Sequence, residues 1–137
     1  MKIKDMMSRD VQVARSADPI QEVAARMGAG NFGFLPVSDG DTLIGTITDR
    51  DIAVRGTGQG KPGAAPVSEV MTAGATTVLD SDDLKSALDL MASGQIRRLP
   101  VLDRHGKLVG VVSLGDLSAR VKATSIGVAL ETISASA

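Results

Sequence analysis

The chain repeats one sequence pattern, and this repeat restricts the possible folds more than any other feature. Leu35-Pro36-Val37 returns 64 residues later as Leu99-Pro100-Val101, and Gly45–Asp51 returns 65 residues later as Gly110–Asp116. Solenoid repeats are shorter, roughly 20–50 residues. The pattern therefore predicts two copies of a small unit of strands and helices that pack together. Functional residues are expected where the copies meet.

The first copy, residues 1–56, predicts the order strand, helix, strand, strand, helix. Asp18 is placed to cap a helix that has Pro19 in its first turn. Apolar residues at helical spacing predict a core face formed by Ile20, Val23, Ala24 and Met27. The other elements are expected as an extended segment at 11–14, strands at 34–37 and 43–48, and a helix from 48 or 49 to 55.

The second copy, residues 67–121, repeats this plan, so the fold class is predicted as α/β (α+β). Ser81 or Asp80 is expected to cap a helix whose apolar face is formed by Leu84, Ala87, Leu88 and Met91. Strands at 99–102 and 108–113 are predicted to form a hairpin, and a last helix begins near Leu114. Glycine and proline at 57–66 predict a flexible polar linker. The sequence assigns no role to the tail, residues 122–137.

The composition argues against nucleic acid and membranes as partners. The chain has 15 Lys and Arg against 16 Asp and Glu, with no long block of one sign. Nucleic-acid binders usually present a basic face, and membrane-surface helices are basic and amphipathic. No apolar run approaches the ~20 residues of a membrane span. The absence of cysteine is typical of a reducing compartment, so a soluble cytoplasmic protein is expected.

No set of catalytic residues can be assembled from the sequence. The single histidine, His105, is expected to be exposed in a hairpin turn, without the geometry that a general base needs. With no cysteine and one histidine, a transition-metal site is not expected either. An enzyme is therefore not predicted.

The strongest candidate site is a duplicated G-x-x-[ST]-x-x-D pattern at the end of a strand. Thr48 is followed three residues later by Asp51, and Ser113 by Asp116. Hydroxyl and N–H groups at a helix N-terminus can bind phosphate, and a carboxylate can accept both hydroxyls of a ribose. The same spacing is also close to a capping box, which needs no ligand. The sequence leaves both interpretations open.

Two arginines distinguish the copies. Arg97 and Arg98 come directly before the second Leu-Pro-Val strand, where they are either solvated or available to bind phosphate. The matching positions in the first copy are Gly33 and Phe34, which carry no charge. If both sites exist, they are chemically unequal.

Taken together, these patterns resemble a tandem pair of cystathionine β-synthase (CBS) domains, the Bateman module, over about residues 4–121. The resemblance rests on the paired starts Asp5-Met6-Met7 and Glu69-Val70-Met71, both Leu-Pro-Val strands, the acidic turn after each, and both G-x-x-[ST]-x-x-D endings. It implies two β-α-β-β-α repeats packed with pseudo-two-fold symmetry. In that family, clefts between the repeats bind AMP, ADP, ATP, NAD or S-adenosylmethionine, and the modules commonly form homodimers.

The resemblance also implies roles for individual residues. Asp51 and Asp116 would hold ribose hydroxyls, with Thr48 and Ser113 in contact with ribose or phosphate. Arg97 and Arg98 stand where the family often places phosphate contacts, whereas Phe34 could partly fill one cleft. Short strands would line the adenine slots at Val11, Val13, Thr76, Thr77 and Val78.

The resemblance implies a regulatory or sensor module that signals through its own assembly or through an effector protein. The alternative is an interaction or structural protein with no nucleotide bound.

Overall fold

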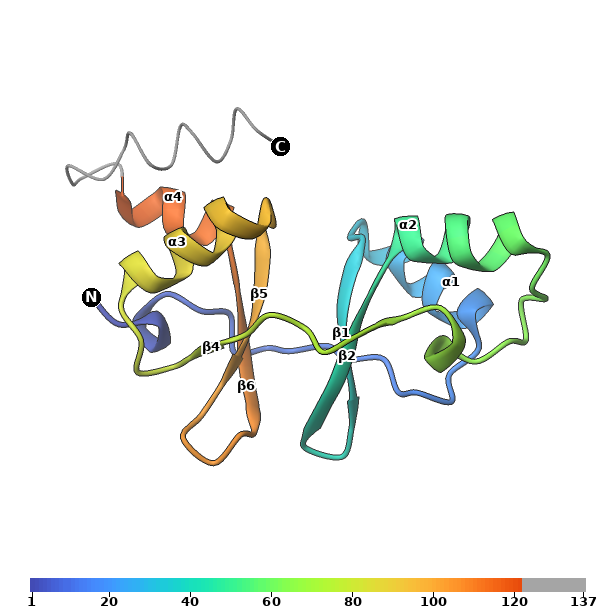
Figure 1. Cartoon of the computed structure of the whole chain (residues 1–137), viewed down its shortest axis with the longest axis horizontal. Coiled ribbons are helices and arrows are strands. Elements are labelled where there is room, and N and C mark those ends of the chain that lie inside the picture. Colours follow the sequence, from blue (N-terminus) through green and yellow to red (C-terminus); the bar gives the residue numbers. More distant parts are fainter. Residues whose placement is uncertain (122–137) are drawn as a thin grey trace. The chain divides into compact units, whose positions relative to one another are not determined.

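The computed structural model describes residues 1–121, which form two compact units (Figure 1). Residues 12–75 make up one of them, the central unit. Residues 1–11 and 76–121 make up the other, the terminal unit. Each unit therefore combines the helix and hairpin of one sequence copy with the opening segment of the other copy. The tail at 122–137, to which the sequence assigns no role, lies outside the described residues.

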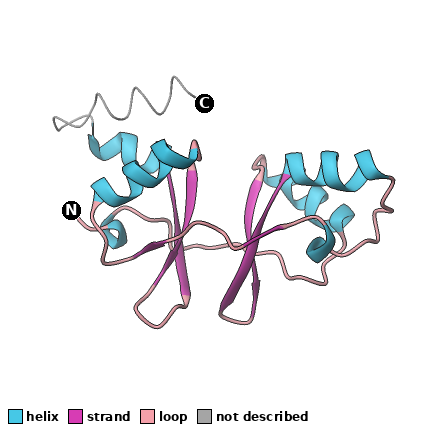
Figure 2. Cartoon of the chain, viewed as in Figure 1, coloured by secondary structure: helices cyan, strands magenta, loops and turns pink. Residues whose placement is uncertain are grey.

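The central unit packs one helix and a short helical run against a three-stranded sheet (Figure 2). Its sheet has the order β1-β2-β3, all antiparallel, and Ala14 adds a parallel bridge to Val37. Its elements are α1 (Ile20–Gly30), β1 (Phe34–Asp39), β2 (Thr42–Thr48), α2 (Asp49–Asp51), the π-helical η2 (Ile52–Gly56), the 3-10 helices η3 (Thr57–Gln59) and η4 (Val67–Glu69), and β3 (Thr72–Ala73).

The terminal unit has the same plan, with sheet order β4-β5-β6. The β4–β5 pair is parallel, the β5–β6 pair is antiparallel, and Ser8 bridges Val111. Its elements are η1 (Ile3–Asp5), β4 (Val78–Leu79), α3 (Leu84–Gly94), β5 (Arg98–Leu102), β6 (Leu108–Ser113) and α4 (Leu114–Val121). The predicted mixed α/β fold is confirmed.

Apolar helix faces meet the buried side of each sheet. The face predicted for α3 is confirmed, because Leu84, Ala87, Leu88 and Met91 are all buried. On α1, Ile20, Val23 and Met27 are buried against β1 and β2. Ala24 is exposed, so its predicted place in the core is wrong. The buried stripe of α1 follows positions 20, 23 and 27, and residue 24 falls outside it.

Residues 1–11 and 67–75 open the two copies, and each packs in the unit of the other copy; we call them the exchanged segments. They lie against matched glycines on β2 and β6. A Cβ on Gly45 would lie 2.5 Å from the carbonyl oxygen of Thr72, and one on Gly110 would lie 2.8 Å from that of Ser8. Both positions therefore need glycine, since any side chain would force the neighbouring backbone away. The duplicated glycine of the sequence pattern is explained by this close approach.

Both predicted helix caps are wrong. The N-cap of α1 is Pro19, while Oδ2 of Asp18 accepts a hydrogen bond from the Arg15 N–H at 2.9 Å. The N-cap of α3 is Asp83 rather than Ser81 or Asp80, and its Oδ1 pairs with Lys2 Nζ at 3.0 Å. The Asp18 carboxylate thus bonds to nearby backbone instead of capping, as short acidic side chains often do.

The segment predicted as a flexible linker makes ordered contacts with the start of α1. The Ile20 N–H donates to the carbonyl of Ala65 at 2.9 Å, and the Gln21 N–H donates to that of Gly63 at 3.0 Å. Ala65 is itself buried. The first turn of a helix has free N–H groups, and here backbone carbonyls from 63 and 65 satisfy two of them.

No helix within residues 1–121 is long and apolar enough to cross a membrane.

Candidate functional site

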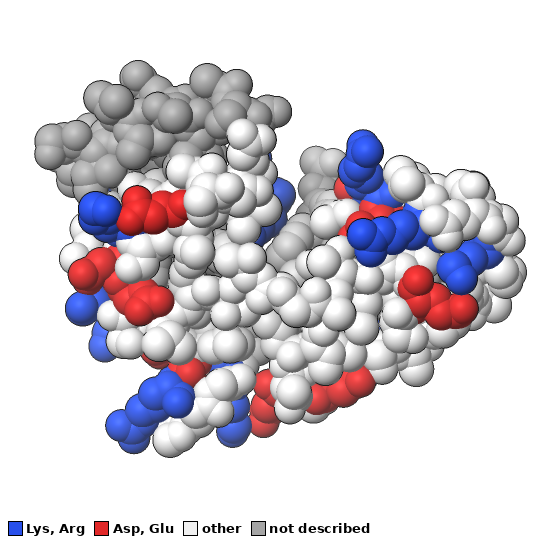
Figure 3. Space-filling view, in the orientation of Figure 1, with Lys and Arg blue, Asp and Glu red and all other residues white. Residues whose placement is uncertain are grey.

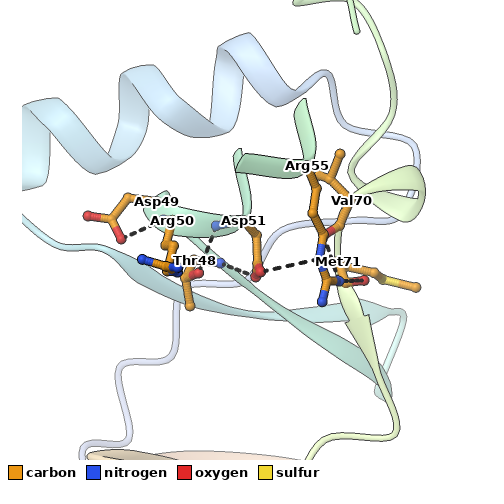
Figure 4. A network of polar contacts seen from close by, with 7 residues as sticks. All are labelled: Thr48, Asp49, Arg50, Asp51, Arg55, Val70 and Met71. Atoms are coloured by element: carbon orange, nitrogen blue, oxygen red, sulfur yellow. Dashed lines mark hydrogen bonds and ion pairs between the residues drawn. The ribbon is translucent and has the colours of Figure 1, made fainter. Parts of the chain in front are cut away.

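The candidate site of the central unit lies at the junction where β2 ends and α2 begins (Figure 4). The Asp51 N–H donates to Thr48 Oγ1 at 3.1 Å, and the Thr48 N–H donates to Asp51 Oδ2 at 3.0 Å. These two bonds are a reciprocal capping box. The Asp51 side chain keeps 16% of its surface exposed. The carboxylate is thus fixed in direction without being sealed off from solvent.

The terminal unit has the same junction between β6 and α4. The Asp116 N–H donates to Ser113 Oγ at 3.0 Å, and the Ser113 N–H donates to Asp116 Oδ2 at 2.9 Å. The capping box that the spacing predicted is therefore formed in both units. Each box uses only one carboxylate oxygen, Oδ2, so capping does not exclude ligand binding through Oδ1.

A second pair of matched residues, Arg55 and Arg120, ties each junction helix to the exchanged segment. Nη1 of Arg55 donates to the carbonyl of Met71 at 3.2 Å, and its Nε lies 4.0 Å from Oδ1 of Asp51. Nη2 of Arg120 donates to the carbonyl of Asp5 at 3.1 Å. The sequence shows these arginines as identical partners but gives no sign of their role, because the carbonyls they bind are distant in the chain.

Strand pairing places Arg98 and Phe34 beside the two hydroxyl residues. Arg98 lies directly opposite Ser113 in the β5–β6 pair, and Phe34 lies directly opposite Thr48 in the β1–β2 pair. Directly opposed residues have Cβ atoms about 4.5–5.5 Å apart and share one face of the sheet. The terminal junction therefore has an exposed guanidinium where the central junction has a half-buried aromatic ring.

The residues preceding these strands also differ. The carbonyl of Arg97 accepts a hydrogen bond from the Leu114 N–H at 2.7 Å, and that of Gly33 accepts one from the Asp49 N–H at 3.0 Å. A Cβ on Gly33 would lie 2.8 Å from Oδ2 of Asp49. The space beside residue 33 is thus occupied by a carboxylate. The terminal unit therefore gathers Arg97, Arg98, Ser113 and Asp116 at one junction.

The segments predicted to line adenine slots are only partly strands. The strand predicted at 11–13 is wrong, because strand pairing begins at Ala14. The lining of an adenine slot by Val11 and Val13 stays a prediction. Val11 belongs to the terminal unit and Val13 to the central unit. The carbonyl of Val13 accepts a bond from Arg26 Nη1 at 3.0 Å, and Val11 and Val13 are both half-buried.

In the other segment, the short strand predicted near 76–78 is shifted to Val78–Leu79. Val78 is buried and Thr77 is half-buried, while Thr76 is exposed.

The acidic turns after β1 and β5 have a structural role. Hydrogen bonds from the Ser16 side chain and backbone hold the pKa of Asp39 below its ordinary value. The backbone N–H groups of Lys107 and His105 lower the pKa of Asp103 in the same way. His105 is exposed in this turn.

Within residues 1–121, no cluster of three or more His, Cys, Asp or Glu could hold a metal ion.

Acidic and basic side chains lie close to one another on the face drawn in Figure 3. This agrees with the near balance of 15 Lys and Arg against 16 Asp and Glu.

Comparisons with known proteins agree with the doubled geometry. The family profile of the CBS domain matches residues 3–55 and 67–123. The CBS domain-containing protein YhcV of Bacillus subtilis is 44% identical over 133 residues, which cover 96% of this chain and 94% of YhcV.

Two solved structures are also similar. CBSX2 in complex with AMP has a TM-score of 0.80 at 25% identity, covering 89% of this chain and 96% of CBSX2. The CBS domain pair of MJ0100, in complex with 5-methylthioadenosine and S-adenosyl-L-methionine, has a TM-score of 0.77 at 28% identity. That match covers 88% of this chain and 98% of MJ0100's.

Proposed function

The chain belongs to the CBS-domain family as a tandem pair of CBS domains, and from this we infer that it binds an adenosine-containing ligand as a regulatory sensor. The candidate ligands are AMP, ADP, ATP, NAD and S-adenosylmethionine. Support comes from relatives whose structures hold AMP or S-adenosyl-L-methionine. We propose no catalytic step.

One observation carries the proposal: each capping box holds its aspartate by one oxygen. The second oxygen of Asp116 is left for a ligand, whereas that of Asp51 lies 4.0 Å from Arg55 Nε. Oδ2 of Asp116 is bound by the Ser113 N–H at 2.9 Å, and no donor to Oδ1 is found among residues 1–121. A carboxylate fixed in this way needs little further ordering when ribose hydroxyls donate to its second oxygen. Arg97 and Arg98 would then supply donors to a phosphate at the terminal junction.

We propose that the signal is a change in assembly, either as a homodimer or with an effector protein. A ligand can shift such an equilibrium only if it binds the two states with different affinity. Sedimentation velocity with and without ligand measures this shift directly. An unchanged sedimentation coefficient at saturation would contradict signalling through self-assembly and leave the partner route.

The second candidate function is an interaction module that binds no nucleotide. The observation in its favour is that both capping boxes are complete without a ligand. The central junction also has Phe34 and Gly33 in place of basic residues.

Isothermal titration of ligand-stripped protein with the five candidate ligands separates the two functions. Saturable binding to any of them supports the sensor, whereas no binding to all five favours the interaction module.

The matched variant is the double substitution Asp51→Asn and Asp116→Asn. Asparagine can keep its carbonyl oxygen in the capping box, but it presents an NH₂ donor where the ribose needs an acceptor. We expect binding to be lost while the protein stays folded. Asp89→Asn is the control, because Asp89 lies on the exposed side of α3 in an ion pair with Lys85 at 2.9 Å. Binding by the double variant as tight as wild type would contradict the proposed site.

A further inference from the structure

The two junctions differ in charge around the same capping box. The terminal junction has Arg97 and Arg98 beside Asp116. The central junction has Asp49 and Asp51 together with two cations, Arg50 and Arg55, and Nε of Arg55 lies 4.0 Å from Oδ1 of Asp51. With the matched Arg120 counted in the terminal unit, these groups carry a formal charge of +2 there and of zero in the central unit.

Residue 33 and the side chain of Asp49 lie next to each other, so the difference between the two junctions involves both positions. A Cβ on Gly33 would lie 2.8 Å from Oδ2 and 2.9 Å from Cγ of Asp49. Asp49 is held there because its Oδ1 accepts a hydrogen bond from the Arg50 N–H at 2.9 Å. The central unit thus combines glycine with an acid at the positions where the terminal unit combines Arg97 with Leu114.

The ring of Phe34 adds a second difference. It lies opposite Thr48, and it is half-buried, whereas Arg98 lies opposite Ser113 and is exposed. A phosphate next to Phe34 would lose hydration without gaining the guanidinium donors that Arg98 supplies at the matching position, which is costly for a charged group. An uncharged or cationic group beside the ring has no such cost, and a cation over its face is attracted.

We propose that the two junctions select different adenosine derivatives. The terminal junction binds a phosphorylated adenosine nucleotide, and the central junction binds an adenosine derivative that carries no phosphate. This inference rests on the proposed function, because it assumes that both junctions bind adenosine ligands. It goes beyond that function by giving each unit its own ligand class.

Amide resonances test the selectivity at each junction in the intact protein. The amides of Asp51 and Asp116 both belong to a capping box, so each reports on its own junction in a ¹⁵N–¹H spectrum. AMP and adenosine are titrated separately. We expect the ratio of AMP affinity to adenosine affinity to be at least about tenfold higher at Asp116 than at Asp51, since the terminal junction carries the larger positive charge.

An exchange of the paired residues provides the matched variant. Gly33→Arg with Asp49→Leu gives the central unit the Arg97–Leu114 combination and removes the carboxylate that a side chain at 33 would meet. It should raise the AMP to adenosine ratio at Asp51 about tenfold and leave the ratio at Asp116 unchanged. Arg50→Gln should leave adenosine binding at Asp51 intact.

The outcomes separate this inference from the proposed function. Equal AMP to adenosine ratios at the two amides would overturn the selectivity and leave nucleotide binding in place. Tight AMP binding at Asp51 that is lost in Arg50→Gln would also overturn it, because Arg50 would then be acting as a phosphate ligand. If neither compound moves either amide at millimolar concentration, the selectivity is overturned, and the proposed function is then decided by the titrations with ADP, ATP, NAD and S-adenosylmethionine. The wild-type titration decides the matter even if the double variant does not fold.

Discussion

The two units share a capping box of almost the same dimensions and differ in the residues around it. The paired bonds measure 3.0 and 3.1 Å in the central unit and 2.9 and 3.0 Å in the terminal unit. Beside them, Gly33 and Phe34 stand where the other unit has Arg97 and Arg98. The capping box depends only on two residues three apart in one chain segment. The residues beside it can therefore differ in charge and size between the two units while the box is kept. The comparison shows that a duplicated scaffold can keep its geometry while its two sites diverge.

The largest effect is expected from filling the space where the exchanged segment crosses β2. Gly45→Ala should lower the free energy of unfolding by about 3 kcal/mol, because overpacking against a fixed backbone forces the chain to shift. Gly110→Ala should cost a similar amount in the terminal unit. Urea unfolding followed by circular dichroism measures both.

Gly28→Ala is the control, since a Cβ at this position would meet nothing within 4 Å beyond the backbone of its own helix and its two chain neighbours. It should stabilise the protein by about 0.5–1 kcal/mol, because alanine loses less backbone entropy in a helix than glycine does. A Gly45→Ala variant as stable as wild type would contradict the close approach to the Thr72 carbonyl.

Removing one hydroxyl from each box should have a smaller and equal effect in the two units. Thr48→Ala and Ser113→Ala should each lower the free energy of unfolding by about 1 kcal/mol, the usual cost of losing an N-cap side chain. Thermal unfolding monitored by circular dichroism provides the measurement. A loss in only one unit would show that the two boxes are not energetically equivalent despite their matching distances.

Breaking the arginine ties should cost less still. Arg55→Gln removes the hydrogen bonds to the Val70 and Met71 carbonyls, and Arg120→Gln removes the one to the Asp5 carbonyl. Each variant should cost about 0.5–1 kcal/mol. Hydrogen exchange gives a local readout. The Met71 amide should exchange faster in the first variant and the Met7 amide in the second. Faster exchange at both amides in both variants would mean that the ties do not act within single units.

The smallest effect is expected from the acidic turns and concerns pH. The pKa values of Asp39 and Asp103 are lowered in the folded protein, so these groups stabilise the fold above their ordinary value of 3.8. That contribution is lost as the pH falls below this value, because protonation removes the acceptor. Asp39→Asn should therefore flatten the fall in melting temperature between neutral and acid pH. An unchanged slope would contradict the bond to Ser16 as its cause.

Local patterns predicted the elements well and the helix starts poorly. Spacing along α3 predicted all four of its buried residues, and the strand pairs around both Leu-Pro-Val segments were also predicted. Asp18 and Asp80 look like caps in the sequence, yet the structure begins α1 after Pro19 and α3 after Asp83. A short acidic side chain can bond to any nearby N–H, so its presence alone does not fix where a helix starts.

Repeats and periodicity predicted the duplicated fold, and the three-residue spacing of each hydroxyl and aspartate predicted a capping box as one of two interpretations. Tertiary packing places the opening segment of each copy in the other unit and brings the carbonyls of residues 63 and 65 to the start of α1, and no local pattern predicts either contact. The same is true of the contact between Asp49 and the space beside Gly33. These contacts join residues distant in the chain, and their partners are set by the packing of whole elements.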